Sequence, residues 1–140
     1  MIKCLKYYKK EAKLQFMVSD EIKYTTDHLW VKQIQTGLFR IGVTYDYLDR
    51  LAAIRLVELP KVGSAISSGD SMAVLESSKA AIELPAPFSG IVKKINADVV
   101  ADPGLINRLP MTDGWLLEIG TNQPEGLANL LSEEDYQKLL

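Results

Sequence analysis

The close spacing of turn residues through the middle of the chain most limits what it can fold into. Proline cannot donate a hydrogen bond to a neighbouring strand, and glycine beside a polar residue favours a turn, so each such position ends the element before it. These positions are Pro60, Gly63, Gly69-Asp70, Pro85, Pro87, Ser89-Gly90 and Asp113-Gly114. The short intervals between them predict short strands, which indicate a barrel or a sandwich and not a parallel α/β sheet.

The residues between these turns predict individual elements. The expected strands are residues 28–35, 39–43, 55–59 and 115–119. The first two are expected to form a hairpin with its turn near Thr36-Gly37. Residues 45–53 have mixed helical spacing and predict a short helix. Two short helices are expected within 124–140, the second beginning at Ser132, whose hydroxyl can cap the amide of Asp135. The predicted fold is therefore mainly β with flanking helices.

Composition bounds the class of protein. The chain has 140 residues, of which 47% are apolar and 24% are charged, so it is long enough for one domain and is not intrinsically disordered. A formal net charge of −2 argues against nucleic-acid binding, which needs an excess of basic residues. No apolar run approaches the roughly 18 to 20 residues of a membrane-spanning helix. Cys4 is the single cysteine and cannot form an internal disulfide. We expect a soluble, cytoplasmic monomer.

Side chains suited to catalysis are scarce. His28 is the single histidine, and the sequence contains no GxSxG turn, CxxC pair, HExxH, P-loop or GxGxxG. One histidine and one cysteine also leave little from which to build a metal site. We interpret the chain as one that carries or binds, and not as an enzyme. His28 is expected to be a hydrogen-bonded residue at the surface or the edge of the core.

The first twenty residues differ in charge from the rest. Residues 1–20 hold five lysines against Glu11 and Asp20, which gives +3, whereas the remaining residues carry −5. We therefore treat residues 1–20 as a basic N-terminal extension and residues 21–140 as the folded domain, with C-terminal helices in 124–140. The extension fits a solvated tail or a basic amphipathic membrane anchor.

The most specific segment is 71–84, which reads as a β-hairpin. If Ser78 and Lys79 form a two-residue loop, Leu75 pairs with Ile82 and Ala73 with Leu84, and these apolar residues share one face. A slip by one residue would mix apolar and polar faces, which favours this register. The loop lacks the Asn-Gly or Asp-Gly of the primed turns, so a type I turn is expected.

This register places Lys79 at the tip of a rigid ribbon. Its neighbours are small: Ser77, Ser78, Ala80 and Ala81. An enzyme could bring its active site over the lysine without a clash, and acylation would remove the positive charge and attach an arm at a fixed point. On this geometry alone, an ordinary exposed lysine in a hairpin is the favoured interpretation.

The chain resembles the glycine cleavage system H protein family over roughly residues 22–140. The central match is Glu76-Ser77-Ser78-Lys79-Ala80-Ala81. The other matches, in the same order and spacing, are Asp27-His28, Trp30-Val31, Ile41-Gly42-Val43-Thr44, Val57-Glu58-Leu59-Pro60, Ala86-Pro87-Phe88-Ser89-Gly90, Asp102-Pro103, Asp113-Gly114-Trp115-Leu116 and Ser132-Glu133-Glu134-Asp135-Tyr136. A single ESxKA motif would be weak evidence, whereas this ordered series is specific.

The resemblance implies a lipoyl-type barrel-sandwich hybrid with added helices and a non-catalytic carrier. Lys79 would receive lipoate through an amide. The residues that the resemblance assigns to the same cofactor site are Glu76, Ser77, Ser78, Ala80, Glu83 and His28. The implied partners are the pyridoxal-phosphate glycine decarboxylase (P protein), the aminomethyltransferase (T protein), dihydrolipoamide dehydrogenase (L protein), and a lipoate ligase or lipoyl transferase.

The chain departs from the family pattern at Leu29, where members usually have a glutamate that helps to shield the loaded arm. A leucine offers no charge or hydrogen-bond acceptor for an amine. The departure keeps open a lipoyl carrier or relay for another pathway, such as lipoate assembly or sulfur oxidation. A structural homologue without lipoate and an adaptor bound to membranes through residues 1–16 are two further hypotheses.

Overall fold

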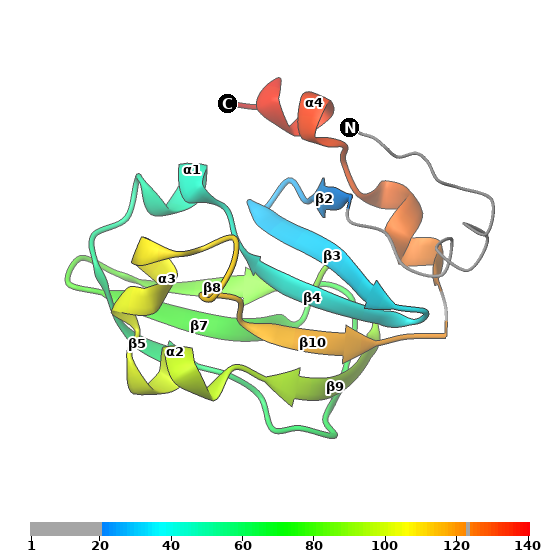
Figure 1. Ribbon diagram of the computed structural model, residues 1–140, viewed down its shortest axis with the longest axis horizontal. Coiled ribbons are helices and arrows are strands. Elements are labelled where there is room, and N and C mark those ends of the chain that lie inside the picture. The colour runs from blue at the N-terminus through cyan, green and yellow to red at the C-terminus, as the bar shows by residue number, and fades with distance from the viewer. Residues whose placement is uncertain (1–20, 123) are drawn as a thin grey trace.

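Two antiparallel sheets form the body of the protein. The computed structural model describes residues 21–122 and 124–140 (Figure 1), and the N-terminal extension predicted for residues 1–20 lies outside them. The larger sheet has the order β2 (Ile22–Tyr24), β3 (Leu29–Gln35), β4 (Leu38–Val43), β10 (Leu117–Gly120), β9 (Gly90–Ile95) and β6 (Ala65–Ile66). The smaller sheet has the order β5 (Ile54–Glu58), β7 (Ser71–Ser77) and β8 (Ala81–Pro85). The prediction of a mainly β fold of short strands with flanking helices is confirmed.

The two sheets share one apolar core. Buried side chains from both sheets belong to a single cluster, with Val57, Leu75 and Leu84 from the smaller sheet and Leu29, Ile41, Val92 and Ile119 from the larger. Side chains alternate between the two faces of a strand, so the inward-facing residues of both sheets fill the space between them. The hydrophobic effect of this cluster holds the β7–β8 hairpin against the body of the protein.

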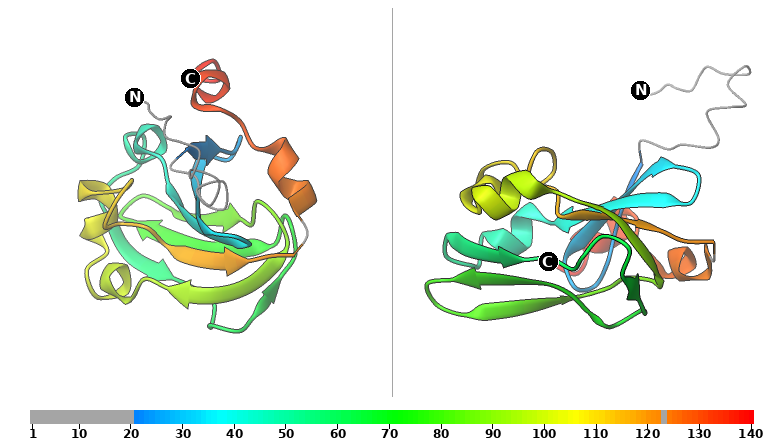
Figure 2. Two further views of the ribbon diagram at one scale, coloured as in Figure 1. Left: turned by 45° about the vertical axis from the view of Figure 1, so that its right-hand side comes forward. Right: turned by 90° about the horizontal axis from the view of Figure 1, so that it is seen from below.

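In residues 21–122 and 124–140, five short helical segments flank the sheets. They are α1 (Tyr45–Leu48), α2 (Ala97–Ala101), α3 (Gly104–Arg108), the 3₁₀ segment η2 (Pro124–Asn129) and α4 (Glu133–Gln137). Figure 1 shows α1, α2 and α3 at the end of the sheets where the β7–β8 hairpin turns, and the right-hand view in Figure 2 agrees. None of the helices in the described part of the chain is long and apolar enough to cross a membrane.

The predicted boundaries need several corrections. The helix expected over 45–53 ends at Leu48, and the first C-terminal segment is a 3₁₀ helix. Strand β3 begins one residue later than predicted because His28 has a φ of 68°, outside the strand region. Strand β10 begins at Leu117 instead of 115, and the carbonyl of Trp115 accepts a hydrogen bond from the Asn96 side chain at 2.7 Å.

Helices α2 and α3 were not predicted at all. Each has five residues and buries a single side chain, Val99 in α2 and Ile106 in α3. One apolar residue per helix leaves no repeating 3.6-residue pattern for a sequence to reveal. The cap of α2 is nevertheless readable in retrospect, since the Asn96 side chain accepts from the amide of Asp98.

The C-terminal segment is attached to the sheet through an aromatic cluster of Tyr24, Trp30 and Tyr136. The Tyr24 and Tyr136 rings stack with centroids 4.7 Å apart. Tyr24 and Leu131 exchange two backbone hydrogen bonds, of 2.8 and 2.7 Å. Trp30 covers Gly42 so closely that a Cβ there would lie 2.5 Å from the indole. The predicted cap at Ser132 is confirmed, with the hydroxyl accepting from the Asp135 amide at 3.1 Å.

Leu29 has no exposed surface and packs in the main core. Replacing it with glutamate would place a carboxyl group among apolar side chains, so we expect Leu29→Glu to lower the free energy of unfolding by about 3 kcal/mol or more. Leu29→Met conserves volume and is expected to cost less than about 1.5 kcal/mol. Urea unfolding of both variants measures the difference. Equal stability of the two variants would contradict this burial.

Candidate functional site

The β7–β8 hairpin has the register that the sequence predicts. Leu75 pairs with Ile82, Ala73 with Leu84, and Glu76 with Ala81. Ala73, Leu75 and Leu84 are buried on the inner face. A bulge between Ser71 and Ala73 shifts the pairing at the far end of the hairpin, away from the turn. The buried face therefore fixes which residues form the loop.

Ser77 holds the turn closed. Its backbone amide donates to the carbonyl of Ala80 at 2.9 Å. Its hydroxyl oxygen accepts from the amides of Lys79 at 3.2 Å and Ala80 at 3.3 Å. Neither Ser78 nor Lys79 has a positive φ, which excludes the primed turns and agrees with the predicted type I geometry. A serine in this position satisfies backbone amides that the short loop would otherwise leave to solvent.

Lys79 is exposed at the tip of this turn, and Ser78 and Ala80 beside it are exposed as well. Among the residues that the structure describes, no carboxylate forms an ion pair with Lys79. The flanking side chains are short, so a second protein can approach the amine from several directions. This geometry suits a lysine that another enzyme acylates and that then carries the acyl group at the end of a rigid hairpin.

Two predicted site carboxylates lie on the outer face of the same hairpin. Glu76 is half-buried and pairs opposite Ala81, whereas Glu83 is exposed and pairs opposite Val74. Since directly paired residues share a side of the sheet, both carboxylates point away from the core. The structure thus brings together six of the seven predicted site residues on one hairpin: Glu76, Ser77, Ser78, Lys79, Ala80 and Glu83.

The seventh predicted residue, His28, lies in the turn that joins β2 and β3 of the larger sheet. Its Nδ1 lies 2.9 Å from the Tyr136 hydroxyl, which in turn lies 2.7 Å from the Thr44 hydroxyl. The His28 ring stacks on Tyr47 with centroids 4.9 Å apart. His28 therefore joins β3, α1 and α4, and its assignment to the cofactor site stays a prediction.

Burial has the largest effect on the pKa values of His28 and Tyr136. It lowers the pKa of His28, with Arg50 acting in the same direction and Asp27 and Asp46 opposing it. It raises the pKa of Tyr136, which the hydrogen bond with the Thr44 hydroxyl partly offsets. Sequence reasoning missed the link between His28 and Tyr136, which are 108 residues apart in the chain. Only the C-terminal helix that carries Tyr136 could be predicted.

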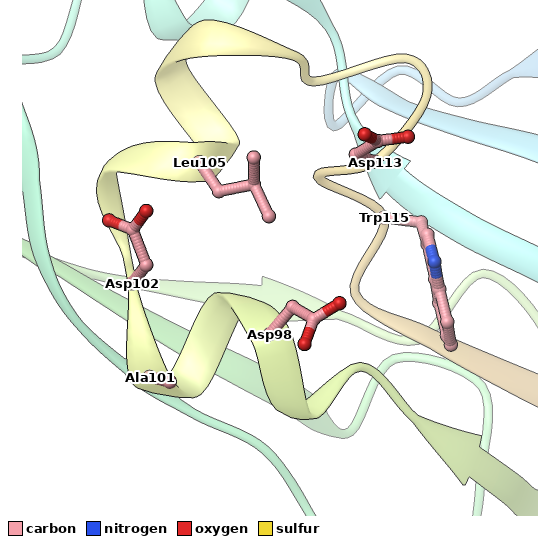
Figure 3. A pocket seen from close by; sticks show the side chains of 6 residues that line it. All are labelled: Asp98, Ala101, Asp102, Leu105, Asp113 and Trp115. Atoms are coloured by element: carbon pink, nitrogen blue, oxygen red, sulfur yellow. The ribbon is translucent and has the colours of Figure 1, made fainter.

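A separate hollow of about 400 Å³ lies between α2, α3 and the segment that precedes β10 (Figure 3). Its lining residues are Asp98, Ala101, Asp102, Leu105, Asp113 and Trp115. Asp102 forms an ion pair with Arg108, and the guanidinium of Arg40 lies 4.5 Å from the Trp115 ring. No residue of the β7–β8 hairpin lines this hollow, so it is not part of the lysine site.

Comparison with known proteins supports the family resemblance found in the sequence. A family model described as glycine cleavage H-protein matches residues 22–140. The chain is 40% identical over 123 residues to the glycine cleavage system H protein of Pectobacterium atrosepticum, which covers 88% of this chain and 95% of that protein. It is 41% identical over 124 residues to the H protein of Carboxydothermus hydrogenoformans, covering 89% and 95%. A crystal structure of an H protein from Mycobacterium marinum has a TM-score of 0.72 at 30% identity, covering 88% of this chain and all of that one.

The lowered pKa of His28 predicts a contribution to the pH dependence of stability. The unfolded chain binds a proton near pH 6.5, whereas folded His28 resists it, so this contribution is present above about pH 6.5 and is lost as pH falls toward the folded pKa. His28→Asn removes the titration and keeps a residue that tolerates positive φ. We expect the free energy of unfolding of the wild type to fall more than that of His28→Asn between about pH 7 and pH 5.

Because His28 is the single histidine, its imidazole NMR resonance is unambiguous and reports the folded pKa directly. A midpoint at or above about 6.5 would contradict the prediction.

Proposed function

The chain belongs to the glycine cleavage H-protein family, which makes it a non-catalytic lipoyl carrier, and we propose that Lys79 is the residue that carries the lipoyl group. The observation that supports this most is the position of Lys79 as the exposed amine at the tip of a two-residue turn. Family membership alone would not identify the attachment residue, whereas the turn presents one lysine at a fixed point.

The hairpin residues are proposed to present the amine and the bound arm. Ser77 keeps the turn closed through its hydrogen bonds, and Ser78 and Ala80 leave space for an approaching active site. Glu76 and Glu83 provide negative charge on the outer face, where an attaching enzyme would meet them. When bound, the lipoyl group supplies a dithiolane that takes up and releases an aminomethyl unit. The protein contributes a rigid base for that tether.

Tethering explains why a carrier of this size can serve several enzymes. An arm fixed at one point has a high effective concentration at each partner's active site, without the need for tight docking. The proposed partners are the P, T and L proteins of glycine cleavage and a lipoate ligase or lipoyl transferase. We propose that the protein acts in the cytoplasm as a monomer and that its chemistry resides in the cofactor and the partner enzymes.

A second candidate function rests on Leu29. The family resemblance implies an arm-shielding glutamate at this position, whereas Leu29 is fully buried in the core. A carrier that does not shield a loaded amine fits a lipoyl relay that serves another pathway. Reconstitution with P, T and L proteins distinguishes the two functions, because glycine cleavage requires turnover with all three and a relay does not.

The attachment residue is tested by intact mass. Apo-protein incubated with a lipoate ligase, lipoate and ATP is expected to gain the mass of one lipoyl group, and Lys79→Arg is expected to gain none because arginine has no acylable amine. Lys61→Arg is the matched control, since Lys61 is also an exposed loop lysine. A mass gain that persists in Lys79→Arg would refute the assignment.

A further inference from the structure

The outer face of the smaller sheet continues beyond the hairpin onto β5. Leu56 pairs with Glu76, which pairs with Ala81, and these three residues form a row across the sheet. Glu58 pairs with Val74, which pairs with Glu83, and these form a second row. Directly paired residues share a side, so all six lie on one surface. We call this surface the outer face, and its residues are Leu56, Glu58, Val74, Glu76, Ala81 and Glu83.

The outer face combines apolar area with negative charge. Leu56 is 44% exposed, which is unusual for a leucine on a strand whose neighbours Ile54 and Val57 are buried. Three of the six residues are carboxylates and none is basic, although the exposed Arg55 lies in the bulge of β5. Helices α2 and α3 contact β5, yet Leu56 and Glu58 are both exposed. A partner surface complementary to the outer face would be basic and would have an apolar depression that accepts Leu56.

The position of this surface relative to Lys79 indicates what covers it. The first row is three residues from Lys79, or about 10 Å along the strand, and the second row is about 16 Å away. An enzyme that acylates Lys79 must bring its active site to the amine itself, within one side-chain length of the turn. A globular protein in that position covers the sheet surface behind the turn. Partners that act on the far end of an attached arm need not approach so closely.

We infer that the outer face is the docking surface for the enzyme that acylates Lys79, with Leu56 as its apolar anchor and Glu58 extending the acidic surface onto β5. This inference rests on the proposed function of Lys79 and adds β5 to the surface that the attaching enzyme recognises. In the reaction, the neutral Lys79 amine attacks the acyl carbon of an activated lipoyl donor. The new amide bond forms, the bond to the leaving group breaks with departure of its electron pair, and the amine loses a proton.

Initial rates of lipoylation measure the docking directly. Apo-protein is titrated against a lipoate ligase with lipoate and ATP, and KM and kcat for the carrier are compared for Leu56→Ser and Glu58→Gln. The matched controls are Leu109→Ser, at a leucine that is 43% exposed, and Glu134→Gln, at an exposed glutamate on α4. Non-enzymatic acylation of Lys79 by an N-hydroxysuccinimide ester controls for the reactivity of the amine.

We expect Leu56→Ser combined with Glu58→Gln to raise KM about five- to tenfold, with kcat and non-enzymatic acylation unchanged. Glu58→Gln should also weaken the dependence of KM on salt, because a charge pair with the enzyme is lost. A KM within twofold of the controls would overturn the inference while Lys79 remained the attachment residue. Failure of the wild type to be lipoylated at Lys79 would instead remove the proposed function and this inference with it.

Discussion

The pairing register of β7 and β8 is the constraint on which the site depends. Burial of Leu75 and Leu84 fixes that register, and Ser77 closes the loop that follows from it. Because side chains alternate along a strand, a shift of one residue would turn the apolar residues of one strand outward and change which residues form the loop around Lys79. The free energy of core burial is thus what positions an exposed, polar residue. The small side chains around Lys79 contribute accessibility and little stability.

Patterns that repeat within a few residues could be predicted from the sequence. The hairpin register, the β3–β4 hairpin with its turn near Gly37, and the Ser132 cap depend on local alternation or on one capping contact, and the structure confirms each. Helices α2 and α3 could not be predicted, because each buries a single residue and is held by tertiary contacts. The start of β3 was misplaced because nothing local reveals the positive φ of His28.

Contacts between distant segments were the part of the site that the sequence could not reveal. His28 meets Tyr136 and Thr44 only after β3, α1 and α4 have come together. The exposure of Leu56 likewise depends on the bulge in β5, which turns it toward the outer face beside Glu76. The sequence around Lys79 was sufficient to locate the amine. The three-dimensional structure was needed to find the surface that lies beside it.

We propose that the turn, and not merely a nearby lysine, defines the attachment point. The most direct test moves the amine by one residue within the same loop, by combining Ser78→Lys with Lys79→Ser, and measures intact mass after incubation with a lipoate ligase, lipoate and ATP. The variant retains Ser77 and the paired strand residues, so the change is confined to the position and direction of the amine. We expect no gain of a lipoyl group in this variant. Full lipoylation of the variant would contradict it.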